Sequence, residues 1–517
     1  MTVASEFTSY DEVEGYCGAL SYEPGERVTL HTSCRAAVFD VVVERWGAER
    51  ELVWSCRNVA GTVPPLPADA DANGCGWPSA VEFDIPSAWR SGFYLVTMTA
   101  AGAPQDRATS FACFVVRAAV PTSPILLVVA TNTYNAYNDW GGVSLYTGGK
   151  AVSFRRPYGR GMLCRDEVER DDRKSRPVRR GEQPDVDGMI YQEHRWSLGL
   201  PGYMASAGWF TYERRFVEWA ERAGIALDYA ISTDLEDHPG LLDGYRLVVG
   251  IGHDEYWSAG GRDAVEDFVR GGGNYASFSG NTMFWQVRFT GDRRDTMVCH
   301  KYSAHDTDPL GGIGERHGQT GLWSDPVVGR PESAFLGASS VGGLYARFGM
   351  ATPRASGGYT VFRDDHWMLD GTALRYGDQL GADDGVVGYE TVGCRLAFDE
   401  FQLPVSAGGD GAPAGIEVVA WAPSSNLRYG EYPKSITALD DQGDLEFIAE
   451  RIHGRADEDT MARIRHGNSV MLAHRPYAGG GEVVTVGSTD WVFGLADPCV
   501  ARVTANVLAR LGSANGR

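Results

Sequence analysis

The sequence predicts a multi-domain protein in which an all-β domain precedes an α/β domain, and a β-rich segment interrupts the second domain. Three observations support this: short alternating segments before about residue 118, continuous apolar segments between helices after it, and closely spaced turns between about 300 and 470. The chain has 517 residues, which is too long for one ordinary domain. We expect the domains to span 1–118, 119–300, 301–470 and 471–517, the last returning to the α/β core.

The first domain is predicted from short strands that alternate or are rich in β-branched residues, with proline and glycine in the turns between them. These strands are Arg27–His31, Ala37–Val43, Gly92–Met98 and Phe111–Val116. No helical period interrupts them, and the pattern is typical of a β-sandwich of immunoglobulin-like size. It gives no information about chemistry.

The α/β domain begins with Ser123–Thr131, a continuous apolar run of the kind that forms a strand buried on both faces. Strands and helices then alternate, which predicts a parallel sheet with helices on both faces. The expected strands are Ile225–Tyr229, Leu247–Gly252, Asn274–Ser279 and Glu482–Val486, and the expected helices are Tyr212–Ala223, Asp263–Arg270 and Val500–Leu511.

The composition excludes several classes of function. The net charge of −21 argues against nucleic acid or an anionic membrane as the main partner. No apolar stretch is long enough to span a bilayer, and residues 1–18 lack the basic-then-apolar order of a signal peptide. The nine cysteines are scattered without metal-binding spacing, which is typical of reduced thiols. We therefore expect a soluble cytoplasmic protein that acts on a small molecule.

Polar and aromatic residues follow three of the predicted strands, at the edge where open α/β sheets bind ligands. The three loops contain Asn132–Gly142 with Ser144–Tyr146, then His253–Trp257, and then Gly280–Trp285. Each has a structural explanation by itself, since an H-x-E pair can be a helix cap, paired tyrosines can pack together and an Asn can satisfy a turn. Their expected convergence on one rim nevertheless indicates a functional site.

Several chemistries can be screened out by motif. The chain has no G-x-S-x-G elbow, no nucleotide-binding glycine loop and no HExxH zinc motif. Tyrosine, glutamate and histidine remain. A site with two phenolates and one carboxylate is poor for zinc or copper and suits ferric iron, whose charge it neutralises. Such an ion would lower the tyrosine pKa far below about 10 and could activate water for hydrolysis.

At these residues the chain resembles the large (β) subunit of bacterial N,N-dimethylformamidase and its relatives. The resemblance extends through most of the length. It rests on Gly92-Phe-Tyr-Leu-Val-Thr97, Thr133-Tyr-Asn-Ala-Tyr-Asn-Asp-Trp-Gly-Gly142, Ser144-Leu-Tyr146, Ser153-Phe-Arg-Arg-Pro157, Gly252-His-Asp-Glu-Tyr-Trp257, Ser279-Gly-Asn-Thr-Met-Phe-Trp-Gln286 and Val486-Gly-Ser-Thr-Asp-Trp491.

The resemblance implies a mononuclear ferric iron, Fe(III), on a domain similar to class I glutamine amidotransferases. Its ligands would be two tyrosines and a glutamate, which correspond to Tyr137, Tyr146 and Glu255. Tyr134 is the alternative to Tyr137, and Tyr158 is the alternative to Tyr146.

Four more residues match positions that this family places around the iron: His253, Asn281, Lys301 and Glu390. His253 would lie beside the metal, Lys301 would stabilise oxyanion charge and Glu390 would be the general base. Without the resemblance, residue type alone would place Lys301 on the surface and Glu390 in a solvated loop.

The resemblance implies an iron-dependent hydrolase that cleaves the C–N bond of a small linear amide. Two alternatives remain. One is a tyrosinate-iron oxygenase that acts on a small organic or natural-product substrate. The other is a non-catalytic carbohydrate- or protein-binding module, which the predicted β-sandwich and the 14 tryptophans would suit. A homo-oligomer is a family expectation, and the sequence leaves the presence of a small partner subunit open.

Overall fold

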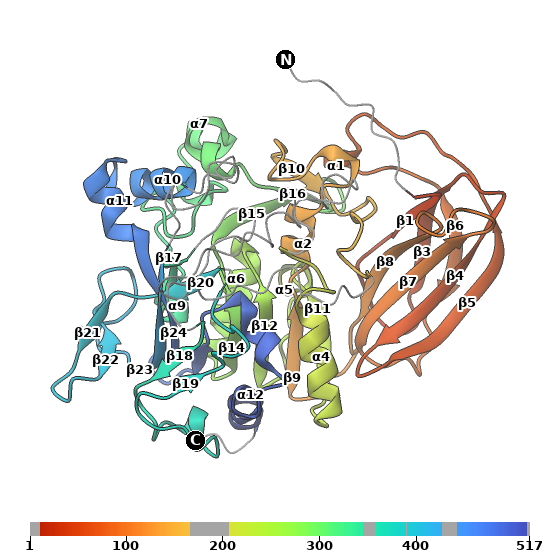
Figure 1. The fold of residues 1–517 in the computed structure, drawn as a ribbon. Helices are drawn as coiled ribbons and strands as arrows, with labels where there is room; N and C mark the ends of the chain where they lie inside the picture. Colours follow the sequence, from red (N-terminus) through yellow and green to blue (C-terminus); the bar gives the residue numbers. More distant parts are fainter. Residues whose placement is uncertain (1–10, 166–205, 345–356, 389, 426–441, 514–517) are drawn as a thin grey trace.

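The computed structural model describes residues 11–165, 206–344, 357–388, 390–425 and 442–513. An N-terminal unit of strands lies beside a larger unit built around one long sheet (Figure 1). The coarse prediction of a multi-domain chain with β-sheets and helices is confirmed. None of the helices in these described ranges is long and apolar enough to cross a bilayer.

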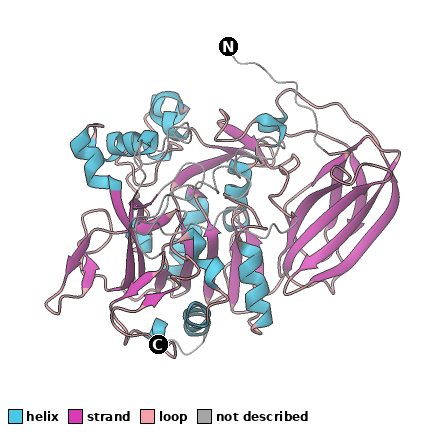
Figure 2. Cartoon of the chain, in the orientation of Figure 1, coloured by secondary structure: helices cyan, strands magenta, loops and turns pink. Residues whose placement is uncertain are grey.

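The N-terminal unit contains two sheets that enclose one hydrophobic core (Figure 2). The three-stranded sheet has the order β1 (Val13–Cys17), β3 (Arg27–Cys34), β6 (Ser79–Asp84). The five-stranded sheet has the order β2 (Ser21–Tyr22), β8 (Thr109–Val116), β7 (Gly92–Ala100), β4 (Val38–Trp46), β5 (Arg50–Ala60). Alternate residues of β3 and β4 are buried, because successive side chains of a strand point to opposite faces.

The larger unit contains a nine-stranded sheet. Its order is β11 (Asp228–Ile231), β9 (Ile125–Val129), β12 (Leu247–His253), β14 (Asn274–Gly280), β25 (Val483–Thr485), β24 (His466–His474), β23 (Val418–Ser425), β18 (Tyr359–Val361), β19 (Gln379–Leu380). The first five strands are parallel, as predicted, and the remaining strands are antiparallel. The prediction did not join the β-rich segment to this sheet: that segment adds four antiparallel strands to it.

Helices cover both faces of the parallel part of the sheet. Ile125, Leu127 and Val129 of β9 belong to the same core as α4 (Glu213–Arg222) and α12 (Pro498–Gly512). Leu126 and Val128 point to the other face and share a core with α6 (Ala259–Arg270). A strand that is apolar on both faces needs a helix on each side, which explains its continuous apolar run.

Smaller elements surround this sheet. A four-stranded sheet has the order β10 (Ala151–Ser153), β16 (Thr296–Val298), β15 (Trp285–Thr290), β13 (Tyr256–Ser258). Two two-stranded sheets are formed by β17 (Ser339–Leu344) with β20 (Thr391–Gly393), and by β21 (Leu396–Phe398) with β22 (Pro404–Ser406). The other helices are α1 (Ala70–Asn73), α2 (Thr131–Tyr137), α5 (Asp234–Asp237), α7 (Ala304–Thr307), α8 (Pro309–Gly312), α9 (Ser333–Leu336), α10 (Gln442–His453) and α11 (Glu458–Arg465). Short 3-10 helices are η1 (Trp140–Gly142), η2 (Lys301–Ser303), η3 (Arg316–Gly318), η4 (Trp367–Leu369) and η5 (Thr489–Gly494).

The segment after β9 differs from its prediction. It was expected to be a loop, but the chain turns directly into the helix α2, Thr131–Tyr137. All seven residues of this helix are buried, polar ones included, so it has no solvent-exposed face and no amphipathic period. The strand expected at Ile225–Tyr229 is also displaced and forms at Asp228–Ile231.

Candidate active site at the carboxyl edge of the central sheet

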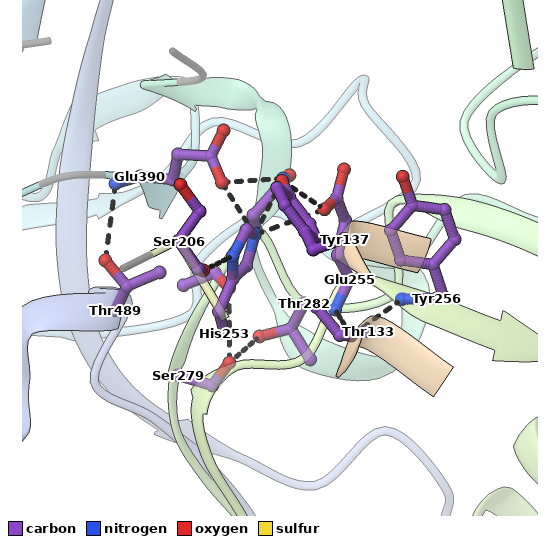
Figure 3. A network of polar contacts seen from close by, with 12 residues as sticks. Thr133, Tyr137, Ser206, His253, Glu255, Tyr256, Ser279, Thr282, Glu390 and Thr489 are labelled. Atoms are coloured by element: carbon purple, nitrogen blue, oxygen red, sulfur yellow. Dashed lines mark hydrogen bonds and ion pairs between the residues drawn. The ribbon is translucent and has the colours of Figure 1, made fainter. Parts of the chain in front are cut away.

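Neighbouring parallel strands bring the candidate residues together. β12 pairs with β9 on one side and with β14 on the other, so their carboxyl ends meet at one edge. Tyr137 ends α2, which follows β9, and Glu255 lies two residues after His253, the last residue of β12. Asn281 comes directly after β14. The predicted convergence of the three loops is therefore present in the fold (Figure 3).

The side-chain oxygens of Tyr137, Tyr146 and Glu255 form a compact cluster, in which Tyr137 and Glu255 are buried and Tyr146 is partly buried. The Tyr137 hydroxyl donates to Glu255 Oε2 at 2.8 Å. The Tyr146 hydroxyl lies 2.7 Å from the Tyr137 hydroxyl and 3.0 Å from both carboxylate oxygens of Glu255. Two tyrosines from the segment after β9 and one carboxylate from the segment after β12 thus meet at one point.

Glu255 is held by contacts on both its backbone and its side chain. Its backbone N–H donates to Thr133 Oγ1 at 3.0 Å, and the Trp285 indole Nε1 donates to its Oε1 at 2.7 Å. Burial raises the pKa of Glu255, while His253 and Lys301 act in the opposite direction without reversing the shift. Burial also raises the pKa of Tyr146 well above its usual value.

His253 connects this cluster to a second carboxylate. Its Nδ1 donates to the carbonyl oxygen of Ser206 at 2.7 Å, which directs Nε2 toward the two glutamates. Nε2 lies 2.7 Å from Glu390 Oε2 and 3.3 Å from Glu255 Oε2. Burial lowers the pKa of His253, but the adjacent Glu390 and Glu255 carboxylates raise it, and the net direction is upward.

Asn281 and the backbone around Glu390 hold that second carboxylate. Asn281 Nδ2 donates to Glu390 Oε2 at 3.0 Å. The backbone oxygen of Glu390 accepts from Thr489 N–H at 3.1 Å. Gly280 permits this approach, because a Cβ at that position would lie 2.1 Å from the Glu390 carbonyl oxygen. The terminal motif that includes Thr489 therefore helps to position Glu390.

Lys301 is buried, with 3% of its surface exposed, and its Nζ lies 3.2 Å from the centre of the Tyr146 ring. Glu390 is also buried, with 4% exposed. The expectation from residue type, a surface lysine and a solvated acid, was wrong for both. Lys301 and Asn281 adopt left-handed backbone conformations with φ of 49° and 51°, which are uncommon outside glycine and concentrate at functional sites.

The two alternative tyrosines lie elsewhere. Their rings pack against each other in an edge-to-face arrangement, with 6.5 Å between the centres of Tyr134 and Tyr158. Tyr134 interacts with the buried Glu213 rather than with Glu255. Of the two candidate pairs, the structure brings Tyr137 and Tyr146 to Glu255.

Tyr256, Trp285 and Ser206 also contact the site, and the sequence did not assign them a role in it. The Tyr256 hydroxyl donates to the Tyr146 hydroxyl at 2.8 Å. Both aromatic residues stand in motifs that were singled out, Tyr256 directly after Glu255 and Trp285 four residues after Asn281. The sequence places both residues close to predicted site residues, but the direction in which their polar atoms point depends on the fold.

The donor set fits a hard cation. Ligand atoms bound at about 2.0–2.2 Å and at right angles lie about 2.8–3.1 Å apart, which is the spacing of the three oxygens here. His253, Glu255 and Glu390 also offer ligand atoms that all lie within 4.8 Å of one another. The site could therefore hold a metal.

Curated relatives are found at modest identity. The N,N-dimethylformamidase beta subunit of an Alcaligenes species is 26% identical over 236 residues, covering 44% of this chain and 30% of the relative. That of Paracoccus aminophilus is 24% identical over 458 residues, covering 84% of this chain and 54% of the relative. The chain thus matches about half or less of the length of each relative.

A structural similarity is much weaker. A chain in a structure that explains T cell specificity and activation by toxic shock syndrome toxin-1 covers 20% of this chain, and 98% of its own length is matched. Its sequence identity is 14% and its TM-score is 0.15, so it carries no argument.

The family model described as N,N-dimethylformamidase beta subunit-like, C-terminal, matches residues 40–504, which include both sheets of the N-terminal unit in part and the whole candidate site. This chain therefore belongs to the N,N-dimethylformamidase beta subunit-like family.

Proposed function

We propose that this protein is a metal-dependent hydrolase that cleaves the C–N bond of a small linear amide. The observation that supports this best is the buried meeting of Tyr137, Tyr146 and Glu255 oxygens within 2.7–3.0 Å, beside the His253–Glu390 pair. The names of the curated relatives are consistent with amide hydrolysis. Family membership and the chemistry of the donor set thus favour the same reaction class.

Tyr137, Tyr146 and Glu255 would hold a single ferric ion, since two phenolates and one carboxylate neutralise its charge. When bound, such an ion supplies Lewis acidity, which polarises a carbonyl oxygen or lowers the pKa of water. The Trp285 and Thr133 contacts fix the Glu255 carboxylate in one orientation, as partners of metal ligands generally do.

Glu390 is the proposed general base. It would take a proton from the attacking water while the hydroxide oxygen bonds to the amide carbon. The same proton would then pass to the amine nitrogen as the C–N bond breaks, giving a carboxylic acid and an amine. His253 Nε2 and Asn281 Nδ2 both contact Glu390 Oε2, so they fix the orientation of the base, and the His253 imidazole can share the transferred proton.

Lys301 would stabilise negative charge that develops on the substrate oxygen. Its ammonium group is buried among aromatic rings, and a desolvated charge acts more strongly than one in water. The positive charge of Lys301 acts to lower the pKa of Glu255, so it is close enough to influence charge in the oxygen cluster.

We also infer the finer architecture and assembly from the family. The N-terminal unit, 1–118, would be an immunoglobulin-like sandwich. Residues 119–300 and 471–517 would form a class I glutamine amidotransferase-like core, with 301–470 as its β-rich insertion. A homo-oligomer, with or without a small subunit, would be the assembled form; native mass spectrometry of the protein purified from its source would test this.

Metal content and the visible spectrum test the site. We expect about one iron per chain and a broad visible band from tyrosinate-to-iron charge transfer. Glu255→Gln and Tyr146→Phe should lose iron and the band. Glu332→Gln is a matched control, because Glu332 is a buried carboxylate that accepts from Ser324 and Ser339 in another part of the fold. Retained iron in both site variants would contradict the assignment.

The reaction is tested with small formamides and acetamides by measuring amine release. Glu390→Gln should retain iron and lose about 10²- to 10⁴-fold in turnover, since it removes a general base rather than a ligand. Oxygen uptake during turnover would instead support the oxygenase alternative. A native protein that contains no metal and turns over no amide would favour a binding module.

A further inference from the structure

We propose that Tyr256 is a positioning residue of the metal centre: a third phenol that donates its hydrogen bond to the oxygen of Tyr146 and tunes that ligand. The inference rests on the proposed function, because it assumes that Tyr146 is a ligand. It goes beyond that function by assigning a role to a residue outside the proposed ligands and proton-transfer groups.

The geometry singles out Tyr256. Its hydroxyl donates to the Tyr146 hydroxyl at 2.8 Å, and the residue is completely buried. Tyr137 and Tyr146 both contact the Glu255 carboxylate, whereas the Tyr256 hydroxyl donates to the Tyr146 hydroxyl. Tyr256 therefore reaches the oxygen cluster through the oxygen of Tyr146.

The fold fixes this position from both ends of the residue. Tyr256 directly follows Glu255 and begins β13, so its backbone is paired with Trp285 of β15. Its carbonyl oxygen accepts from Asn132 Nδ2 at 3.2 Å. Glu255 and Tyr256 are adjacent in sequence, and Trp285 contacts the Glu255 carboxylate through its indole and the Tyr256 backbone through strand pairing. A shift of one residue would therefore displace the other.

The hydrogen bonds form a chain that ends on Glu255. Tyr256 donates to Tyr146, Tyr146 donates to Tyr137 or Glu255, and Tyr137 donates to Glu255. A metal among the three ligand oxygens would replace the bonds of Tyr137 and Tyr146 and would leave that of Tyr256 in place. The two phenolates would then differ, since one of them accepts a hydrogen bond from a third phenol.

A hydrogen bond to a phenolate oxygen withdraws electron density from it and stabilises its filled orbitals. Charge transfer from that phenolate to iron then requires more energy, and the bound iron becomes easier to reduce. Bonds to charged acceptors are stronger than neutral ones, so a buried donor should have a measurable effect on the spectrum. Tyr256 would thus act by lowering the electron density on the Tyr146 oxygen, and it would not bind the metal itself.

The test compares iron-loaded wild type with Tyr256→Phe, using iron content and the visible spectrum. We expect Tyr256→Phe to bind as much iron as wild type and to shift the charge-transfer band to longer wavelength. Tyr245→Phe is the matched control, because it removes another buried phenol whose hydroxyl donates to a carboxylate, Asp228, at 3.2 Å. Its band should coincide with that of wild type.

The outcomes separate this inference from the proposed function. A wild-type band that Tyr256→Phe leaves unchanged would overturn the inference alone. Loss of iron in Tyr256→Phe, with iron retained in Tyr146→Phe, would also overturn it, because Tyr256 would then be a ligand. Wild type without iron or band, after anaerobic loading, would overturn both. Circular dichroism of each variant checks that it has folded, and resonance Raman spectra identify the tyrosinate that changes.

Discussion

Glu213 is a buried acid whose pKa is raised by its surroundings. It is the first residue of α4 and lies beneath the site, where Ala130 N–H donates to its Oε1 at 3.3 Å. Burial raises its pKa from 4.5 to about 7, and the nearby Tyr134 and backbone N–H groups only partly offset this. The folded state therefore holds a proton on Glu213 that the unfolded chain would release near pH 4.5.

We predict that Glu213→Gln stabilises the protein above neutral pH. Because the folded-state pKa is raised, stability falls as pH rises from about 4.5 through 7, and the full penalty is present at higher pH. Glutamine keeps the acceptor and cannot ionise, so the variant should gain about 1–3 kcal/mol at pH 8 and little at pH 4.5. Urea unfolding at the two pH values measures this. Glu315→Gln, at an exposed position, is the control; an equal gain at both pH values would contradict the prediction.

Site residues at the ends of regular strands could be predicted from the sequence, whereas those in irregular segments could not. His253, Glu255 and Asn281 lie at or within two residues of the carboxyl ends of strands, so the rule for ligand sites in α/β sheets located them from sequence. Lys301 and Glu390 lie in short irregular segments whose positions depend on contacts with distant residues, such as Thr320 and Thr489. No local pattern encodes such contacts, and only the family resemblance indicated these two residues.

At the scale of elements, continuous apolar strands were predicted well because burial on both faces leaves a clear signal. β9, β12 and β14 were expected within one or two residues of their bounds. α2 was missed because a fully buried helix of seven residues has no alternation of faces. The antiparallel strands β23 and β24 were also missed as members of the main sheet, since pairing across long sequence distances leaves no local trace.

Asp308 organises the segment that presents Lys301, and this yields an element-scale prediction. The Arg288 guanidinium binds both of its oxygens, at 2.8 and 3.0 Å, and Thr320 donates to Oδ2 through its backbone and its hydroxyl. Thr320 in turn accepts from the backbone N–H of Lys301 at 3.0 Å. The Asp308 carboxylate therefore links Arg288 to Thr320, the residue whose carbonyl oxygen binds the backbone of Lys301.

We predict that Asp308→Asn destabilises this segment in a pH-dependent way. Although burial acts in the opposite direction, hydrogen bonds from Arg288 and Thr320 lower the Asp308 pKa well below its usual range. Its stabilisation is therefore present above about pH 4 and is lost as pH falls. The variant should lose about 1–3 kcal/mol at pH 7, and the difference from wild type should shrink toward pH 3. Hydrogen exchange at residues 300–320 measures this, and a constant difference across pH would contradict it.

At the scale of the whole molecule, the N-terminal unit and the central sheet share one hydrophobic core. Phe93 of β7 stacks on Trp209 with 3.8 Å between ring centres, and both belong to the core that contains β9. Arg45 pairs with Glu221 of α4 at 2.6 Å. An interface that is apolar and also contains buried charge pairs should unfold together with the units that it joins.

Arg117 provides the sharpest test of this coupling. It follows β8 and pairs with Asp234 of α5 at 3.0 Å, with 5% and 4% of the two side chains exposed. We predict that Arg117→Ala costs about 3–5 kcal/mol, because it leaves the Asp234 charge buried without its partner. Asp234→Asn in the same chain should recover part of this loss, since the amide carries no charge.

Calorimetry and urea unfolding of the single and double variants measure the coupling free energy, with the exposed pair Arg90 and Glu51 as a control worth less than about 1 kcal/mol. We expect one unfolding transition in every variant, shifted to lower temperature in Arg117→Ala. If the N-terminal unit folded independently, the loss of this pair would instead separate the curve into two transitions. In that case the site at the edge of the central sheet would survive while the N-terminal unit melts, and bound iron would be retained through the first transition.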